Sequence, residues 1–159
     1  MDRIDEGKTG VLYALSHDSV EKVPREHGGI TEQKRIHRIC ADLLRTSPIP
    51  FHILRVPRLL DPDSPRYIME RVDTSRPLFL ALEPPHEPLL LVELVRAWIL
   101  FWTRAGLAAY DFELYIQPDR TVVLLDFDSF ITRETGEELP PPSFFHHPSF
   151  PREFRERLW

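Results

Sequence analysis

The stretch AAYDFELYIQPDRTVVLLDFDSF, residues 108–130, contains two short apolar runs separated by a turn. The runs cover residues 114–116 and 121–125, and Pro118 and Asp119 lie between them. Aliphatic and β-branched residues on both sides of a Pro-Asp turn predict a β-hairpin. Because a hairpin folds its two ends together, residues just outside the two runs are expected to lie close in space.

Carboxylates flank both ends of this predicted hairpin. Asp111 and Glu113 precede the first strand, and Asp126 and Asp128 follow the second. Carboxylates brought together repel one another and raise the pKa of at least one of them, unless a cation or a substrate proton separates them. Magnesium takes one or two carboxylates and completes its shell with water and substrate phosphate. Acidic residues in ordinary solvated turns give the same pattern, so both interpretations remain open.

The order of these residues resembles the catalytic hairpin of the protein kinase-like fold, which includes protein kinases and aminoglycoside phosphotransferases. In that family a catalytic Asp and a metal-binding Asn precede a strand that leads to Asp-Phe-Gly, whose Asp holds magnesium. The resemblance implies that Asp111 is the catalytic base and that Asp126, Glu113 and Asp128 are metal ligands. Ala109-Tyr110 replaces the residues that usually precede the catalytic Asp, and Asp128 replaces the Gly.

The N-terminal part predicts a glycine-containing turn followed by a strand pair. Residues 11–15 and 20–23 predict the two strands, and Gly7 and Gly10 precede the first. A glycine turn lets backbone amides approach a phosphate. In kinase-like proteins a lysine on the third strand contacts the nucleotide phosphates, and the resemblance assigns that role to Lys22. A lysine exposed on an ordinary strand is the alternative.

Residues 31–44 predict the first helix, with apolar side chains repeating on one face. In kinase-like proteins a glutamate on this helix pairs with the strand lysine, and the resemblance assigns that role to Glu32. An acidic residue that complements the helix dipole is the alternative. Residues 67–72, YIMERV, resemble the fifth strand and hinge of the family, which implies that the backbone of Glu70 and Val72 binds adenine.

The segment 88–105 predicts a second helix. It is apolar on nearly all sides and is followed by Gly106, so we expect it to be central and buried. Residues 48–60 predict one or two strands, and 74–88 predict a linker. A short helix is predicted for residues 153–159.

Composition argues against nucleic-acid-binding, disulfide-bonded, secreted and membrane-spanning proteins. The chain has 159 residues, a net charge of −5 and one cysteine. A net negative charge disfavours nucleic-acid binding, and a single cysteine excludes an internal disulfide. The N-terminus has no apolar signal segment, and the longest apolar run is too short to span a bilayer. We therefore expect an intracellular, cytoplasmic protein with no membrane partner.

The C-terminal third also resembles a fungal kinase-like domain of unknown function. The shared features are a Trp- and Ala-rich helix, the Asp111-Phe112-Glu113 segment, the run 124–128 and the aromatic tail 144–152. This resemblance implies that Glu113 belongs to a family pattern.

Together, these patterns predict an α+β protein with a minimal kinase-like fold in a single domain. The expected parts are a small antiparallel N-lobe sheet with one helix (1–73), a hinge (74–88) and a strongly reduced C-lobe (89–159). The resemblance implies a phosphotransferase that uses ATP and Mg²⁺ on a small-molecule substrate, since few residues are left for the helices that hold peptide substrates. The alternatives are a catalytically inactive, pseudokinase-like module that binds a partner protein, and an enzyme that uses the acidic cluster for other chemistry.

Overall fold

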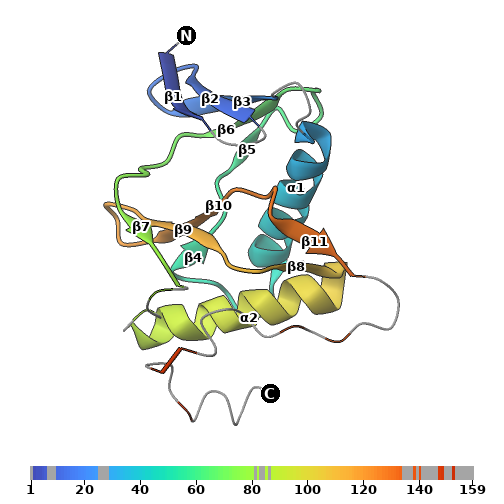
Figure 1. Cartoon of the computed structure of the whole chain (residues 1–159), viewed down its shortest axis with the longest axis vertical. Coiled ribbons are helices and arrows are strands. Elements are labelled where there is room, and N and C mark those ends of the chain that lie inside the picture. The colour runs from blue at the N-terminus through green and yellow to red at the C-terminus, as the bar shows by residue number, and fades with distance from the viewer. Residues whose placement is uncertain are drawn as a thin grey trace.

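The protein, seen here in a computed structural model, is a mixed α+β structure, which confirms the predicted class. The structure describes residues 2–6, 10–24, 29–80, 82, 85, 87–133, 138, 140, 147, 148 and 152. Figure 1 shows one sheet at the top, helix α2 along the bottom, and helix α1 and the remaining strands between them. This arrangement places the hairpin of residues 113–125 in the middle of the molecule.

The upper sheet has five antiparallel strands, all from the first half of the chain. In spatial order they are β1 (Asp2–Glu6), β2 (Gly10–Ala14), β3 (Ser19–Pro24), β6 (Tyr67–Glu70) and β5 (Leu59–Leu60). The hairpin of β2 and β3 and the strand β6 were predicted, and they are confirmed. The prediction missed β1, because four of its five residues are charged and it has no apolar run to recognise.

The second sheet has four strands and contains the predicted hairpin. In spatial order they are β4 (Leu54–Arg55), β10 (Val122–Leu125), β9 (Glu113–Ile116) and β7 (Pro77–Leu78). β9 and β10 are antiparallel, which confirms the hairpin, whereas β4 runs parallel to β10. The linker prediction missed β7, because two residues are too short for a periodic pattern. The predicted strand region 48–60 splits at Pro57, which offers no backbone donor to a ladder, into two strands that join different sheets.

Helix α1 (Ile30–Thr46) covers the predicted range and packs against β3 and β6 of the upper sheet and against α2. Its buried side chains repeat at helical spacing, and they are Ile30, Gln33, Ile36, His37, Cys40 and Leu44. Gly29 precedes the helix, which has no side-chain cap. The buried face thus includes two polar residues, Gln33 and His37, that need internal partners.

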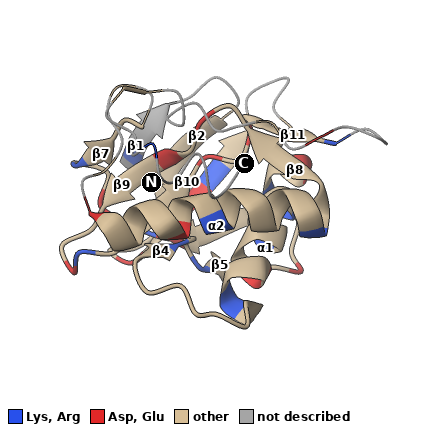
Figure 2. Cartoon of the chain, turned by 90° about the horizontal axis from the view of Figure 1, so that it is seen from below, with Lys and Arg blue, Asp and Glu red and all other residues tan. Residues whose placement is uncertain are grey.

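Helix α2 (Pro88–Ala105) is buried along most of its length, as predicted. Figure 2 shows it lying across the second sheet with few charged residues on its ribbon. Its N-terminus is capped by the Glu87 side chain, which accepts a hydrogen bond from the Leu89 N–H. Gly106 ends the helix in the left-handed conformation at φ 63°, as the sequence predicted.

Glu93, in the middle of α2, is fully buried and bonded to backbone. Its carboxylate accepts hydrogen bonds from the N–H groups of His52 at 3.0 Å, Ile53 at 2.8 Å and Leu54 at 2.9 Å. Two of these donors lie just before β4 and the third is its first residue. The Glu93 carboxylate supplies the acceptor for all three. Glu93 therefore attaches β4, and through it the hairpin, to α2.

The core has two parts that meet at α1. The larger part joins α2, the lower half of α1 and the inner faces of β9 and β10. The smaller lies under the five-stranded sheet and contains Val20, Ile30, Tyr67 and Met69. Neither helix in the described part of the chain is long and apolar enough to span a bilayer. The predicted terminal helix, Gly7 and nearly all of the aromatic tail lie outside the described residues.

Candidate functional site

Two strand pairs bring the predicted acidic residues to one side of the hairpin. β8 (Leu107–Ala109) pairs with β11 (Phe130–Thr132), and Ala109 stands opposite Phe130. The connection from β8 to β9 carries Asp111, and the connection from β10 to β11 carries Asp126 and Asp128. β9 and β10 are also paired, so each connection runs between the β8–β11 pair and the β9–β10 pair. The two connections therefore lie next to each other.

Asp126 has an unusual backbone conformation. Its φ of 65° lies in the left-handed region, which costs a non-glycine residue on the order of 1 kcal/mol. Its Oδ1 accepts a hydrogen bond from the Asp128 N–H at 3.3 Å. The turn directs the Asp126 carboxylate toward the upper sheet, where its Oδ1 lies 3.8 Å from Nζ of Lys22.

The other acidic side chains are held separately. Asp111 Oδ1 accepts a hydrogen bond from the Phe112 N–H at 2.9 Å, and Glu113 Oε1 accepts one from the Tyr115 hydroxyl at 2.6 Å. Within the described ranges, no three His, Cys, Asp or Glu side chains are close enough to hold a metal ion. The expected cluster of three or four carboxylates in one small volume is therefore wrong, because the two connections are adjacent while their side chains take different local partners.

Lys22 is the cation of this site, and its partner is Gln33. The Lys22 ammonium donates to Gln33 Oε1 at 2.6 Å, and only 13% of the lysine side chain is exposed. The alternative of a solvent-exposed strand lysine is therefore wrong. The contact predicted for Glu32 is also wrong: this residue is exposed and pairs with Arg35 one turn along α1. The Arg35 guanidinium lowers the pKa of the Glu32 carboxyl by hydrogen bonding to it.

The helical spacing of buried residues in α1 identifies Gln33 as the residue that meets Lys22. Gln33, Ile36 and Cys40 recur at intervals of three and four, so they share the buried face of α1. Glu32 lies about 100° away from that face, given 3.6 residues per turn. The position that meets the strand lysine is therefore set by the apolar pattern, and in this chain a neutral amide occupies it.

Gly10 makes room for the Lys22 side chain. A Cβ at Gly10 would lie 2.8 Å from the Val23 carbonyl oxygen and 3.0 Å from Cε of Lys22. We expect Gly10→Ala to lower the free energy of unfolding by about 1–3 kcal/mol, as overpacking does, and to displace the lysine. Urea unfolding measures this loss. Gly29→Ala is the control, since nothing lies within 4 Å of a Cβ there; an equal loss in both variants would contradict the steric explanation.

A small hollow of about 30 Å³ lies between the upper sheet and the hairpin, and it is bordered by Leu12, which stands opposite Lys22 in the β2–β3 ladder. It is lined by apolar side chains and by the chain segment after β6, and the lining residues are Leu12, Val20, Met69, Glu70, Arg71, Val72, Thr74 and Leu125. The two residues predicted to bind adenine through their backbone, Glu70 and Val72, both border it. The Glu70 side chain is engaged elsewhere, since it accepts from Arg55 at 2.6 Å and from the Arg58 N–H at 2.8 Å.

Phe127, between Asp126 and Asp128, connects the site to α1. Its ring packs against His37, with ring centroids 4.6 Å apart. His37 is fully buried, and its ring nitrogens contact the Tyr67 hydroxyl at 2.7 Å and the Pro57 carbonyl at 2.6 Å. Burial lowers the pKa of His37 to about 4. The sequence analysis did not single out His37, although it follows Ile36 and lies on the buried face of α1.

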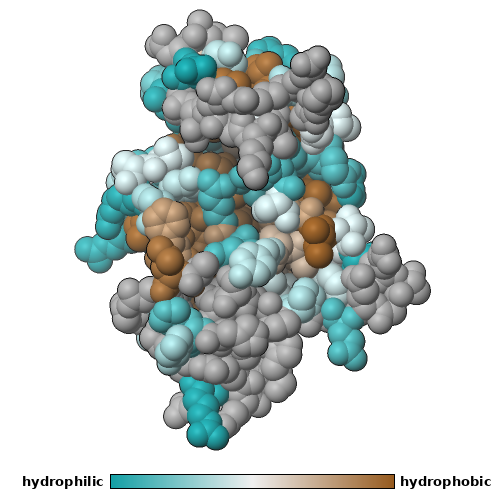
Figure 3. Space-filling model, in the orientation of Figure 1, coloured by the Kyte–Doolittle hydropathy of each residue, from teal (hydrophilic) through white to brown (hydrophobic). Residues whose placement is uncertain are grey.

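A second surface hollow, of about 830 Å³, lies beside β7. Apolar side chains gather at the surface there (Figure 3), and Phe79 and Leu82 are both exposed. The acidic groups that border it have structural partners, because Glu87 caps α2 and Asp119 accepts from Thr121. This hollow is much larger than the one of about 30 Å³ near Lys22, but its acidic groups already have structural roles.

Comparison with protein-family models finds no match to this sequence, and comparison with curated proteins finds no similar one.

Proposed function

We propose that the chain binds ATP with Mg²⁺ at the contact between Lys22 and Asp126 and transfers a phosphoryl group to a small-molecule substrate. The observation that carries the proposal is the contact between Lys22 and Asp126. A lysine from the upper sheet and a carboxylate that follows the hairpin lie 3.8 Å apart, and Leu125, the residue before that carboxylate, lines the small apolar hollow. A cation for phosphate and a carboxylate for magnesium are the two charged groups that phosphoryl transfer needs most.

The charged groups at this contact fit phosphate and Mg²⁺. Leu12, Val20, Met69 and Leu125 line the small hollow nearby, but its volume of about 30 Å³ is too small to enclose a nucleotide base, so the base would lie on its rim. The Asp126 carboxylate is 35% exposed, so a cation can reach its oxygens. Magnesium accepts such a site with one or two carboxylates when phosphate and water complete its shell. A site without a three-carboxylate cluster is therefore compatible with ATP–Mg²⁺ entering as one unit.

Each charged residue of the candidate site has one role in the proposal. Lys22 holds phosphate oxygens, and Gln33 orients its ammonium. Asp126 would hold the metal, and the proposal assigns supporting roles to Asp128, two positions further along the chain, and to Glu113, which stands opposite Leu125 in the β9–β10 ladder. Asp111 would accept the proton of the substrate hydroxyl as its oxygen attacks the γ-phosphorus of ATP, whose bond to the β–γ bridging oxygen breaks to release ADP. Bound ATP–Mg²⁺ supplies the phosphoryl group and neutralises part of its charge.

Thermal unfolding tests the proposal without an assay for the substrate. We expect ATP and Mg²⁺ together to raise the melting temperature by several degrees, because a ligand at about 100 times its Kd adds roughly 2.7 kcal/mol. Asp126→Asn should abolish this shift, while Asp63→Asn, on an exposed loop, should keep it. Absence of any shift in the folded wild-type chain would reject nucleotide binding.

A non-catalytic module that binds a partner protein is the second candidate. It is favoured by the separate partners of Asp111 and Glu113 and by Tyr110, which is exposed immediately before Asp111. The same measurements separate the two candidates. A shift that requires ATP and Mg²⁺ but persists in Asp126→Asn would indicate nucleotide binding without the metal ligand that the phosphotransferase proposal requires.

A further inference from the structure

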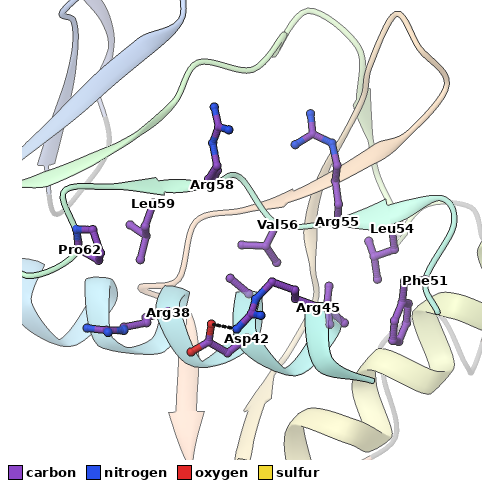
Figure 4. A pocket seen from close by; sticks show the side chains of 12 residues that line it. Arg38, Asp42, Arg45, Phe51, Leu54, Arg55, Val56, Arg58, Leu59 and Pro62 are labelled. Atoms are coloured by element: carbon purple, nitrogen blue, oxygen red, sulfur yellow. Dashed lines mark hydrogen bonds and ion pairs between the residues drawn. The ribbon is translucent and has the colours of Figure 1, made fainter. Parts of the chain in front are cut away.

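A groove of about 540 Å³ runs along the outer side of α1, between this helix and the segment 51–62. Figure 4 shows that Leu54, Val56 and Leu59 point from that segment toward the helix. Phe51 closes one end, and Leu44 and Leu54 are the buried floor. The groove therefore offers an apolar surface that a large side chain can enter, apart from the small hollow near Lys22.

Arginines border the groove. Arg38 and Arg45 project from α1, whereas Arg55 and Arg58 point away from the helix on the opposite side of their segment (Figure 4). Among the described residues that line the groove, Asp42 is the one acidic residue. The cations that face the groove are therefore Arg38 and Arg45, and Asp63 lies beside Arg38 at its rim.

The two arginines on α1 have weak partners. Arg45 meets Asp42 at 3.2 Å, with side chains 71% and 56% exposed. Arg38 meets Asp63 at 3.5 Å, with side chains 54% and 89% exposed. Exposed ion pairs of this kind contribute about 0–1 kcal/mol. Both guanidinium groups can therefore exchange these partners for an incoming carboxylate or phosphate at little cost.

We propose that this groove docks an extended segment of a partner protein in which acidic side chains flank a large apolar side chain. The apolar side chain enters between Val56, Leu59 and Leu44. The acidic side chains pair with Arg38 and Arg45. This inference goes beyond the proposed function, because it concerns a different surface and does not depend on nucleotide binding.

The spacing of the arginines fits an extended segment. Arg38 and Arg45 are seven positions apart on α1, which corresponds to about 10 Å along a helix. An extended chain covers that distance in about three residues. β5 is also the outermost strand of its sheet among the described elements, so its free edge can pair with an extended segment. The predicted pattern is thus an apolar residue with acidic residues on both sides.

Charge and composition favour a peptide over a nucleic acid. Phe51 is the one aromatic residue that lines the groove, and the Arg96 guanidinium already lies 4.2 Å from its ring centroid. Single-stranded nucleic acids bind through several aromatic platforms and a continuous basic track, which this groove lacks. An acidic peptide needs only the two arginines and the apolar floor.

Fluorescence anisotropy with the full chain tests the proposal. The probe is a labelled nonapeptide, Ser-Gly-Glu-Asp-Phe-Glu-Asp-Gly-Ser. We expect saturable binding that weakens as salt is raised, and at least tenfold weaker binding when Ala replaces the Phe or Lys replaces the acidic residues. Lack of saturable binding up to millimolar protein would overturn the proposal. Equal affinity for the Ala peptide would do the same, because it would show charge attraction without docking in the groove.

Variants locate the binding surface. Arg45→Glu and Arg38→Glu should each weaken binding at least tenfold, whereas Arg76→Glu, an exposed residue just before β7, makes the same charge change and should leave it unchanged. All three replaced side chains are surface groups, and circular dichroism verifies that the variants fold. Unchanged affinity in Arg45→Glu and Arg38→Glu would overturn the assignment, as would tighter binding of an oligothymidylate than of the peptide.

Discussion

Replacing Glu93 with Gln is expected to lower the free energy of unfolding by about 2–4 kcal/mol, and replacing it with Ala by about 3–5 kcal/mol. The carboxylate is fully buried and accepts from three consecutive backbone N–H groups. Glutamine keeps the volume and one acceptor oxygen but loses the charge, and its amide NH₂ would face the His52 N–H where Oε2 now accepts. Alanine leaves the donors without partners and adds a cavity. Urea denaturation followed by circular dichroism measures both losses.

Glu87→Gln is the matched control for Glu93. Glu87 lies at the exposed start of the same helix and accepts from one N–H, that of Leu89. Glutamine retains an acceptor there, so the expected loss is below about 1 kcal/mol. If Glu93→Gln were as mild as Glu87→Gln, the attachment of β4 to α2 through this carboxylate would contribute little to stability.

The sequence was sufficient to predict the regular elements whose signals are local. Both helices were predicted within a few residues of their ends, because the apolar stripe of α1 and Gly106 after α2 act over one or two turns. The hairpin β9–β10 was predictable because its turn chemistry lies between two short apolar runs. In contrast, β7 has two residues, and its pairing with β9 depends on a neighbour far along the chain.

The candidate site was predictable in part, for a similar reason. Pairing of β8 with β11 brings the connections that carry Asp111 and Asp126 together, and the order of residues predicted that neighbourhood. Side-chain direction was not predictable from order alone. The left-handed turn at Asp126 and the Tyr115 hydroxyl on Glu113 separate the carboxylates. The register of α1 likewise places Gln33, and not Glu32, against Lys22.

Glu93 and His37 illustrate what a pattern of apolar and polar residues leaves undetermined. Both are polar residues on helix faces that are otherwise apolar, and both are fully buried. A helical pattern shows that such a residue is an exception, yet its partners lie in segments 20 to 41 positions away along the chain. The hydrogen bonds that stabilise these groups arise only when the sheets and helices have assembled.

Acidification is expected to destabilise the protein through His37. The pKa of His37 is lowered from 6.5 to about 4, because burial disfavours the charged ring more strongly than the Pro57 carbonyl and the Glu70 charge favour it. The unfolded state therefore binds a proton more readily than the native state between these two pH values. The stability that depends on a neutral His37 is fully present above pH 6.5 and is lost as the pH falls toward 4. The difference of about 2.5 pKa units corresponds to about 3 kcal/mol.

Stability profiles of wild type and His37→Gln between neutral and acidic pH measure this effect. In the neutral ring, Nε2–H donates to the Pro57 carbonyl and Nδ1 accepts from the Tyr67 hydroxyl, since a carbonyl can only accept. Glutamine can also donate and accept but has no proton to gain, so its profile should be flatter by about 3 kcal/mol over this range. His17→Gln, at an exposed turn, should keep the wild-type profile. Parallel profiles for wild type and His37→Gln would show that His37 is not the group whose protonation destabilises the contact between α1, Tyr67 and Phe127.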